Sequence, residues 1–393
     1  MRVTFISGEW RRTGGIASYL HRLAHALAAR GDAVQIVHGD RTAPVVPGVR
    51  DDCVPGCTLY GQPRKAEAAA TAAALDAIRA FAPDVVHVQG CNNFGLEQAV
   101  RARYRATKTL HVYDYCPSNT KFHHGPDREC VYPTGAMCLP RMGYLSCTTS
   151  RRPTVWTRMQ RRVRAANRNN AGYAKLIVAS EHVRRHALAT GYPAGQVDVI
   201  PYFVGDEAAS NPEPRVILTG GRLVREKGID LFLAALAQVP RPWRAVVAGD
   251  GLEAARLRAQ AQAAGLAGDV EFAGWQDEAG MAALYRRASV VVMPSRWPEP
   301  SGIIGLEAMA HARPVVAFAT GGMPEWLADG ETGLLAPPLD VARLADAIGT
   351  LIADEATARR MGDAGRARAR QVFSPGPHLA RLTALYDALP EPR

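Results

Sequence analysis

The sequence predicts an α/β protein built from two doubly wound domains, each with a parallel sheet. Short apolar runs rich in β-branched residues alternate with alanine-rich stretches in both halves of the chain, which is typical of βα units. The 393 residues exceed one usual core, since a domain commonly holds roughly 100–200 residues. A polar, proline-containing linker at 205–214 separates the two series. We expect domains over 1–205 and 206–372, facing each other across a cleft, and a helix over 373–393 that packs back toward the first domain.

In the N-terminal domain, the predicted strands are short apolar runs followed by turns or helices. They cover 3–7, 33–38, 85–88, 109–113, 176–179 and 197–200. Helices are expected at 16–30 and at about 66–81, where alanine and other good helix formers accumulate. The stretch 116–170 fits neither period and is rich in Cys, Pro, Gly and Arg. We interpret it as an insertion in this domain.

The C-terminal domain repeats the alternation. Strands are predicted at 216–219, 245–248, 270–272, 290–293 and 314–317, with helices from 229, at 252–264, at 281–287, near 305–311 and from 341 onward. Open α/β sheets bind ligands outside the carboxyl ends of their strands. The loops that follow these strands, in the cleft between the domains, are therefore the expected functional site.

Bulk composition narrows the class of protein. The net charge is +10, but only five of the 47 basic residues are lysines, so we interpret the basicity as a compositional background rather than a nucleic-acid surface. No apolar run reaches the roughly 18 residues that span a bilayer, and the first residues lack a signal-peptide pattern. An odd count of seven cysteines argues against a disulfide framework. We expect a cytoplasmic protein.

Two carboxylates eight positions apart give the strongest motif. Glu299 and Glu307 flank Gly302, directly after the strand predicted at 290–293. A helix that begins in this segment offers free N–H groups and a positive dipole end to a diphosphate. Glu307, about two turns into a helix that begins near Ser301, is placed to accept hydrogen bonds from ribose hydroxyls. The alternative is a surface glutamate followed by an ordinary helix glutamate.

A basic loop follows the first strand of the same domain. Arg222 and Lys227 lie between glycines, directly after the strand predicted at 216–219. Arginine supplies a planar fork for phosphate oxygens, and lysine supplies a mobile point charge. We expect both at the diphosphate, with a solvated basic loop as the alternative.

These motifs are part of an ordered set that resembles the retaining glycosyltransferases of family 4. The resemblance implies the GT-B fold, with two Rossmann-like domains facing each other across a cleft, and it covers essentially all of the C-terminal domain; in the N-terminal domain it is looser. The segments that carry it in the C-terminal domain are Gly221-Arg222 to Lys227-Gly228, Gly249-Asp250-Gly251, Phe272-Ala273-Gly274, Pro294-Ser295, Glu299 to Glu307, Gly321-Gly322-Met323-Pro324-Glu325 and Gly330 to Leu335.

The resemblance also implies roles for individual donor-site residues. Arg222 and Lys227 would hold the donor diphosphate, with the Gly15 backbone approaching the same phosphates. Glu307 would bind the ribose, and the turn that ends at Gly274 would lie by the base. The transferred sugar would be contacted by the following groups: Glu299 and the backbone of Gly302, Ile303 and Ile304.

His111 resembles the active-site histidine of the family. Many relatives have an aspartate directly after this histidine, whereas here Asp114 follows three positions later. A hydrogen-bonded histidine at a strand end is the competing interpretation.

The predicted activity is retaining transfer of a sugar from a nucleoside-diphosphate sugar to an unidentified glycan, lipid-linked or small-molecule acceptor, as in polysaccharide or glycoconjugate biosynthesis. The resemblance implies neither a catalytic metal nor a cofactor. The competing functions are a nucleotide-sugar epimerase or phosphorylase on the same scaffold, a non-catalytic sugar-nucleotide sensor, and a basic nucleic-acid-binding protein. No helix-turn-helix, zinc-finger or RNA-recognition pattern supports the last of these, so we expect no nucleic-acid partner.

The insertion carries two further patterns. Cys116, Cys130, Cys138 and Cys147 are spaced too widely for a usual zinc motif, so we favour free thiols and keep a structural zinc as the alternative. The segment Arg151–Arg168 surrounds Trp156 with arginines and predicts a basic helix. Such a helix suits peripheral contact with an anionic membrane, at its inner face, or a phosphorylated acceptor; a solvated helix is the alternative.

Overall fold

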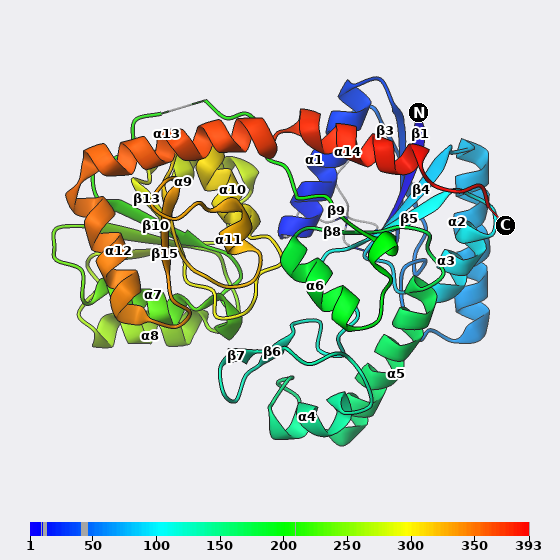
Figure 1. Cartoon of the computed structure of the whole chain (residues 1–393), viewed down its shortest axis with the longest axis horizontal. Coiled ribbons are helices and arrows are strands. Elements are labelled where there is room, and N and C mark those ends of the chain that lie inside the picture. Colours follow the sequence, from blue (N-terminus) through cyan, green and yellow to red (C-terminus); the bar gives the residue numbers. More distant parts are fainter. Residues whose placement is uncertain (9, 11–13, 41–45, 209, 393) are drawn as a thin grey trace. The chain divides into compact units, whose positions relative to one another are not determined.

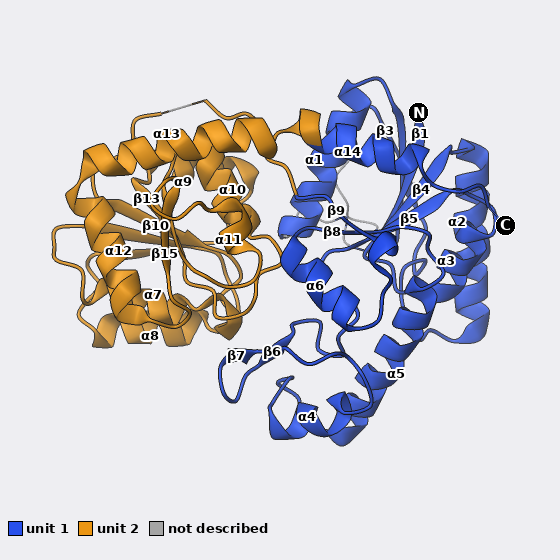
Figure 2. Ribbon diagram, in the orientation of Figure 1, with its two compact units in different colours: residues 1–201, 378–393 blue, residues 202–377 orange. Residues whose placement is uncertain are grey.

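The structure is a computed structural model that describes residues 1–393 except 9, 11–13, 41–45, 209 and 393. The chain divides into two compact units, each described by itself (Figure 2). Unit 1 holds residues 1–201 and 378–393, and unit 2 holds residues 202–377. Both units are α/β, which confirms the predicted fold class.

Unit 1 is built on a seven-stranded parallel sheet with the order β3-β2-β1-β4-β5-β8-β9 (Figure 1). The central strand β1 pairs with β2 on one side and β4 on the other, and its Val3, Phe5 and Ile6 are fully buried. The strands are β1 Arg2–Ser7, β2 Ala33–His38, β3 Val49–Cys53, β4 Val85–Gln89, β5 Ala106–Leu110, β8 Leu176–Val178 and β9 Val197–Val199.

Helices cover the sheet of unit 1 with their apolar faces. In α1, Leu20, Leu23 and Leu27 recur at helical spacing and are fully buried. The last helix of the chain, α14, returns to this unit: the Tyr386 hydroxyl lies 2.7 Å from His87 Nδ1 on β4. The helices are α1 Gly15–Ala29, α2 Arg64–Phe81, α3 Phe94–Arg101, α6 Glu181–Ala189 and α14 Pro375–Asp387, with a short 3₁₀ turn, η1 Ala194–Gln196.

Strand β5 begins three residues before the predicted position. The strand was predicted at 109–113, whereas it covers Ala106–Leu110 and therefore includes Lys108, an unusual residue for a strand buried on both faces. Lys108 is buried nonetheless, and its Nζ lies 3.0 Å from both carboxylate oxygens of Glu97 on α3. The ion pair with Glu97 thus compensates the charge of Lys108 and allows this lysine to be buried within the strand.

The insertion forms a small hairpin and two helices. The hairpin pairs β6 Phe122–His123 with the antiparallel β7 Arg128–Glu129, and it is followed by α4 Cys138–Tyr144 and α5 Pro153–Asn170. One face of α5 is buried through Val163 and Ala166. The basic helix predicted for this stretch is therefore present, as α5.

Unit 2 is built on a six-stranded parallel sheet with the order β12-β11-β10-β13-β14-β15. The strands are β10 Val216–Gly220, β11 Arg244–Ala248, β12 Val270–Gly274, β13 Val290–Met293, β14 Val315–Phe318 and β15 Gly333–Ala336. The helices are α7 Ile229–Leu236, α8 Ala254–Ala263, α9 Glu278–Arg287, α10 Ile303–Ala310, α11 Met323–Trp326, α12 Val341–Ala353 and α13 Glu355–Val372, with a 3₁₀ turn, η2 Arg225–Lys227.

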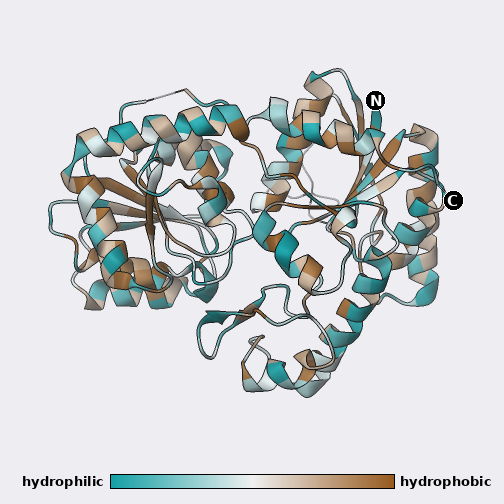
Figure 3. Ribbon diagram, viewed as in Figure 1, coloured by the Kyte–Doolittle hydropathy of each residue, from teal (hydrophilic) through white to brown (hydrophobic). Residues whose placement is uncertain are grey.

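The core of unit 2 lies between its sheet and helices. Ile217, Val247 and Val292 from three strands join Phe232 of α7 and Ile348 of α12 in one buried cluster. Many residues of the strands are accordingly apolar, whereas the helices alternate hydrophilic and hydrophobic bands (Figure 3). Strands buried on both faces read as continuous apolar runs, which is why the sequence located them well.

The strand order of unit 2 reverses between β10 and β13. At such a switch point the loops after two neighbouring strands run to opposite sides and leave a crevice for a ligand. The predicted basic loop follows β10, and the segment with Glu299 follows β13. Within the described ranges, no helix combines the length and apolarity needed to cross a bilayer.

Candidate functional site

The basic loop after β10 is fixed by its glycines. Gly228 has a φ of 66°, and a Cβ there would lie 1.9 Å from the Pro294 carbonyl oxygen, so only glycine lets the two loops approach so closely. The Arg296 N–H donates to the Glu226 carbonyl at 2.9 Å. These contacts join the loop after β10 to the loop after β13.

Lys227 and Glu299 form an ion pair at this junction. Lys227 Nζ lies 2.6 Å from Glu299 Oε1, and the Ser295 hydroxyl donates to the same oxygen at 2.7 Å. Glu299 is 4% exposed. Burial alone would raise the pKa of its carboxyl, but the Lys227 charge and the hydrogen bonds from Lys227, Ser295 and Trp297 hold that pKa below its usual value. Glu299 is therefore ionised at neutral pH.

Arg222 differs from Lys227 in its surroundings. Its side chain is exposed, and within the described part of the chain it has no hydrogen bond or ion pair. Glu299 thus compensates the charge of Lys227, whereas no described carboxylate pairs with Arg222. An exposed guanidinium fork beside a lysine suits a phosphate group.

The first turn of α10 lies against the same loop. Gly302, with a φ of 86°, ends the loop and begins the helix at Ile303. A Cβ on Gly221 would lie 3.6 Å from Ile304 Cδ1 and 3.9 Å from Lys227 Cδ. The helix N-terminus, with its unsatisfied N–H groups and positive dipole end, thus adjoins Lys227 and the backbone next to Arg222.

Glu307 lies nearer the start of its helix than predicted. Because α10 begins at Ile303 rather than near Ser301, Glu307 stands little more than one turn inside it. Its Oε2 accepts a hydrogen bond from the Tyr285 hydroxyl of α9 at 2.9 Å, and its side chain is half-buried. Tyr285 was not anticipated from the sequence, because only the fold brings α9 beside α10.

Glycines also shape the edge of the sheet at β12. Gly274 ends β12 with a φ of 69°, and its carbonyl accepts from the Gly249 N–H at 2.7 Å. A Cβ on Gly249 would lie 1.9 Å from the Gly221 carbonyl oxygen, so the loops after β10, β11 and β12 are in contact. Trp275 follows Gly274 and is 54% exposed. The sequence analysis did not single out this aromatic side chain.

In unit 1, Gly15 and His111 follow the ends of strands. Gly15 is the exposed first residue of α1, which comes after β1. His111 comes directly after β5 and is 4% exposed, with Nε2 2.5 Å from Gln89 Oε1. Burial lowers the pKa of His111 to about 3, so its imidazole is neutral at physiological pH. The roles that the resemblance implies for these two residues stay predictions.

The four cysteines of the insertion do not form a tight cluster. The structure has them as free thiols, with Cys116 buried and the other three partly exposed. His123 Nδ1 lies 3.1 Å from Cys147 Sγ. Across the described residues, one group of three or more His, Cys, Asp or Glu brings its ligand atoms within 4.8 Å of one another, and it contains none of these cysteines.

Two family models match consecutive parts of the chain. The model described as "Glycosyl transferases group 1" matches residues 206–368, which include Arg222, Lys227, Glu299 and Glu307. The model described as "Glycosyl transferase 4-like domain" matches residues 14–202.

Some curated relatives are similar to this protein along most of its chain, and others are similar over about half of it. A glycogen synthase of Mycobacterium tuberculosis is 26% identical over 95% of this chain and 91% of its own length. A D-inositol 3-phosphate glycosyltransferase of Segniliparus rotundus is 34% identical over 49% of this chain and 48% of its own length.

Solved structures share the fold over nearly the full length. A sucrose-phosphate synthase of Thermosynechococcus elongatus is 25% identical, with 99% and 98% of the two chains covered and a TM-score of 0.75. HepE of Anabaena, solved in complex with UDP and glucose, is 19% identical, with 99% and 100% covered and a TM-score of 0.74. The two family matches, the relatives and the two parallel-sheet units agree with the resemblance found in the sequence: the chain belongs to the family 4 glycosyltransferases of the GT-B fold.

Proposed function

We propose that this glycosyltransferase moves a sugar from a nucleoside-diphosphate sugar to its acceptor with retention of the anomeric configuration. The observation that carries the proposal is the contact, at the switch point of unit 2, between the loop that carries Arg222 and Lys227 and the N-terminus of α10. Two cationic side chains and a helix N-terminus match the charge of a leaving nucleoside diphosphate. The HepE structures with UDP and with UDP-glucose lend support to a donor of this class.

In the proposed mechanism, catalysis comes from stabilising the leaving diphosphate. Arg222 and Lys227 would hold its oxygens, and the Ile303 and Ile304 N–H groups would share its negative charge. Lys227 is paired with Glu299 in this structure, so diphosphate binding would draw the ammonium toward the phosphates. Glu299 would then accept hydrogen bonds from hydroxyls of the transferred sugar, and the acceptor would attack on the face from which the diphosphate departs.

Donor class and stereochemistry are tested separately. A thermal-shift panel of UDP, GDP, ADP and dTDP should give stabilisation by one of them, since a ligand at 100 times its Kd stabilises a protein by about 2.7 kcal/mol. NMR of the product formed from the matching α-linked sugar donor, by transfer or by slow hydrolysis, should show the α-anomer first. Initial formation of the β-anomer would contradict retention. Release of a sugar 1-phosphate, or epimerised donor without release, would indicate the phosphorylase or epimerase alternative.

The two glutamates are expected to affect different kinetic constants. Glu307→Ala removes the proposed ribose contact and should raise the donor Kd, whereas Glu299→Gln removes charge at the sugar and should mainly lower kcat. The amide keeps the shape of Glu299, so the hydrogen bond to Ser295 can be preserved. Titration of the donor and steady-state kinetics measure both constants. Tyr285→Phe, which removes the hydroxyl that donates to Glu307, should have a smaller effect on the Kd than Glu307→Ala. If both glutamate variants kept the wild-type Kd and kcat, the segment from Glu299 to Glu307 would not be part of the active site.

We also propose peripheral contact between the insertion and an anionic membrane. The exposed arginines of this region stand on and just before α5: Arg151, Arg152, Arg158, Arg161, Arg164 and Arg168. Exposed apolar side chains occur in the same insertion, with Val131 70%, Met137 60% and Tyr144 88% exposed. Trp156 is only partly exposed, because its Nε1 donates to the Ser150 carbonyl at 2.7 Å and its ring packs on Gly143. Basic residues with apolar neighbours are typical of surfaces that bind acidic lipid.

Vesicle binding measures this contact. The protein should co-sediment with vesicles that contain phosphatidylglycerol and not with pure phosphatidylcholine. Replacing Arg158, Arg161 and Arg164 by alanine should weaken binding by about a hundredfold, since each basic residue near such a surface contributes about 1 kcal/mol. The matched control replaces three exposed arginines of unit 2, Arg343, Arg359 and Arg360. Equal losses in both triple variants would show a net-charge effect without a specific surface.

A further inference from the structure

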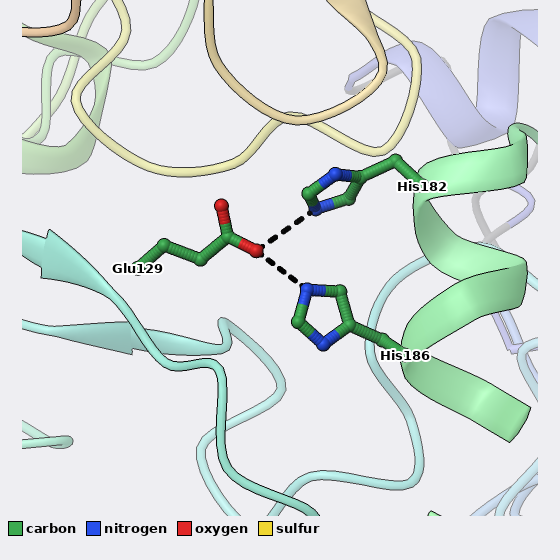
Figure 4. A group of neighbouring side chains, drawn as sticks. All are labelled: Glu129, His182 and His186. Atoms are coloured by element: carbon green, nitrogen blue, oxygen red, sulfur yellow. Dashed lines mark hydrogen bonds and ion pairs between the residues drawn. The ribbon is translucent and has the colours of Figure 1, made fainter. Parts of the chain in front are cut away.

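Three metal-ligating side chains converge between the insertion and helix α6 (Figure 4). Glu129 Oε1 lies 2.5 Å from His186 Nε2 and 3.2 Å from His182 Nε2. Both imidazoles thus address the same carboxylate oxygen. His182 and His186 are 7% and 9% exposed, and Glu129 is half-buried. None of the three belongs to the proposed donor site.

The fold itself brings these residues together. His182 and His186 are four positions apart on α6 Glu181–Ala189, so they share one face, and their ring centroids are 4.9 Å apart. Glu129 ends β7, whose partner strand β6 supplies Phe122 opposite it. The hairpin therefore presents the carboxylate to the histidine face of a helix more than 50 positions later in the chain. No sequence motif joins such distant residues, so the cluster escaped the sequence analysis.

We propose that Glu129, His182 and His186 bind a divalent metal ion of the zinc class. Two imidazole nitrogens and a carboxylate form a common three-residue ligand set for zinc, with a water molecule as fourth ligand. Their ligand atoms lie within 4.8 Å of one another. A tetrahedral ion with bonds of about 2.0–2.1 Å separates its ligand atoms by about 3.4 Å. The distance between Glu129 and His182 fits this geometry, and the distance between Glu129 and His186 would lengthen by about 0.9 Å.

The proposed ion would fasten the insertion to the main body of unit 1. The hairpin has only two residues in each strand, and segments with so little apolar core commonly rely on a metal or disulfide for order. The fully buried Tyr113 packs its ring on both histidines, with centroid distances of 6.2 and 5.7 Å. Tyr113 stands two positions after His111, so the ion would also stabilise the segment that follows β5.

Metal content and metal binding test the proposal directly. Full-length protein, purified without chelator and freed of any histidine tag, should contain about one zinc ion per chain by elemental analysis. Stripping with a chelator should lower the Tm, and adding Zn²⁺ should restore it. Co²⁺ added to the stripped protein should give visible d–d absorption without the intense near-ultraviolet band of thiolate ligands, because no cysteine takes part.

Ligand variants separate this site from the cysteines. Glu129→Gln and the double variant His182→Asn with His186→Asn should each weaken Zn²⁺ binding by more than about a hundredfold, since even outer partners of a metal site change affinity 10–100-fold. Asp51→Asn is the matched control, because it alters a similar carboxylate–imidazole pair, His38 Nε2 to Asp51 at 2.8 Å. Cys130→Ser is the second control. Both controls should keep the metal.

Three outcomes would overturn the proposal. Stripped wild-type protein that binds neither Zn²⁺ nor Co²⁺ at micromolar concentration would show a hydrogen-bonded Glu–His cluster and nothing more. Full metal content in the double histidine variant would place the ion elsewhere. Loss of metal in Cys130→Ser, together with a thiolate band in the Co²⁺ spectrum, would assign the ion to the cysteines. The first outcome and the Co²⁺ spectrum are measured on wild-type protein, so a folding failure of one variant leaves the test intact.

Discussion

Replacing Arg222 and Lys227 together by alanine is expected to lower kcat/KM by more than about a hundredfold. A hydrogen bond to a charged group contributes about 1.5–3 kcal/mol, and each factor of ten corresponds to about 1.4 kcal/mol. Each single variant should therefore lose about ten- to a hundredfold. The two losses need not add, because both side chains would hold one diphosphate. Arg222→Lys should also be impaired, since a point charge does not replace the planar fork.

The two single variants should differ in stability. Arg222 is exposed and makes no ion pair in the described residues, so Arg222→Ala should leave the unfolding free energy unchanged. Lys227→Ala leaves the buried Glu299 without its cation. Breaking a buried pair costs about 3–5 kcal/mol, and because the Lys227 side chain is 19% exposed, we expect the lower end of that range. Urea unfolding of the three proteins measures the difference.

The affinity for a nucleoside diphosphate tests whether Arg222 and Lys227 contact the donor. Calorimetric titration with the diphosphate that gives the largest thermal shift should show weaker binding in each, while binding of the bare nucleoside changes little. Arg225→Ala is the matched control, since it removes an exposed arginine from η2 of the same loop. A double variant that binds diphosphate and turns over like the wild type would show that this loop does not face the donor.

Most of the apolar strands of both sheets could be predicted from the sequence, whereas the polar edge strand β3 could not. In unit 2 the strands β10 to β14 were found within about two residues, and all of them except the half-exposed edge strand β12 are largely buried apolar runs. The short strand β15, Gly333–Ala336, was not predicted, although it is apolar. Edge strand β3, Val49–Cys53, contains arginine and two aspartates and exposes most of its residues, so no pattern marked it. The local sequence pattern thus locates strands whose residues are uniformly buried. It fails for a strand such as β3, which belongs to the sheet through pairing with its neighbour rather than through burial of its side chains.

For the candidate site, the sequence indicated the residue types and the fold supplied their partners. The resemblance singled out Arg222, Lys227 and Glu299, but the ion pair between Lys227 and Glu299 joins loops that are 72 positions apart. Neither this pairing nor the contact of Gly221 with Ile304 has a local signal. Both depend on the adjacency of β10 and β13, which follows from strand order rather than from any motif.

The largest effect on stability is expected from Glu97→Ala in unit 1. Glu97 is fully buried and accepts from Lys108 Nζ with both oxygens at 3.0 Å, and from Asn169 and the Tyr173 hydroxyl at 2.7 Å each. Removing the carboxylate leaves Lys108, only 4% exposed, as a buried charge without its partner. We expect a loss of about 3–5 kcal/mol in unfolding free energy.

The same cluster joins three parts of unit 1, so the effect should spread to function. Glu97 lies on α3, Lys108 on β5 and Asn169 in the last turn of α5. Loosening them should increase hydrogen exchange in α5 and at His111, three positions after Lys108. The amides of α5 and of His111 should exchange faster in Glu97→Ala than in a surface variant with the same change of charge.

A double variant and a surface control separate charge from packing. Glu97→Leu with Lys108→Met removes both charges at similar volume, and it should recover part of the stability because apolar replacement of a buried pair is often neutral or better. The recovery should be incomplete, since Asn169 and Tyr173 lose their acceptor at about 1–3 kcal/mol each. Asp76→Ala breaks the exposed pair with Arg79, whose side chains are 67% and 74% exposed, and should cost less than about 1 kcal/mol. Equal losses for Glu97→Ala and Asp76→Ala in urea unfolding would contradict the assignment of a buried, mutually dependent charge pair.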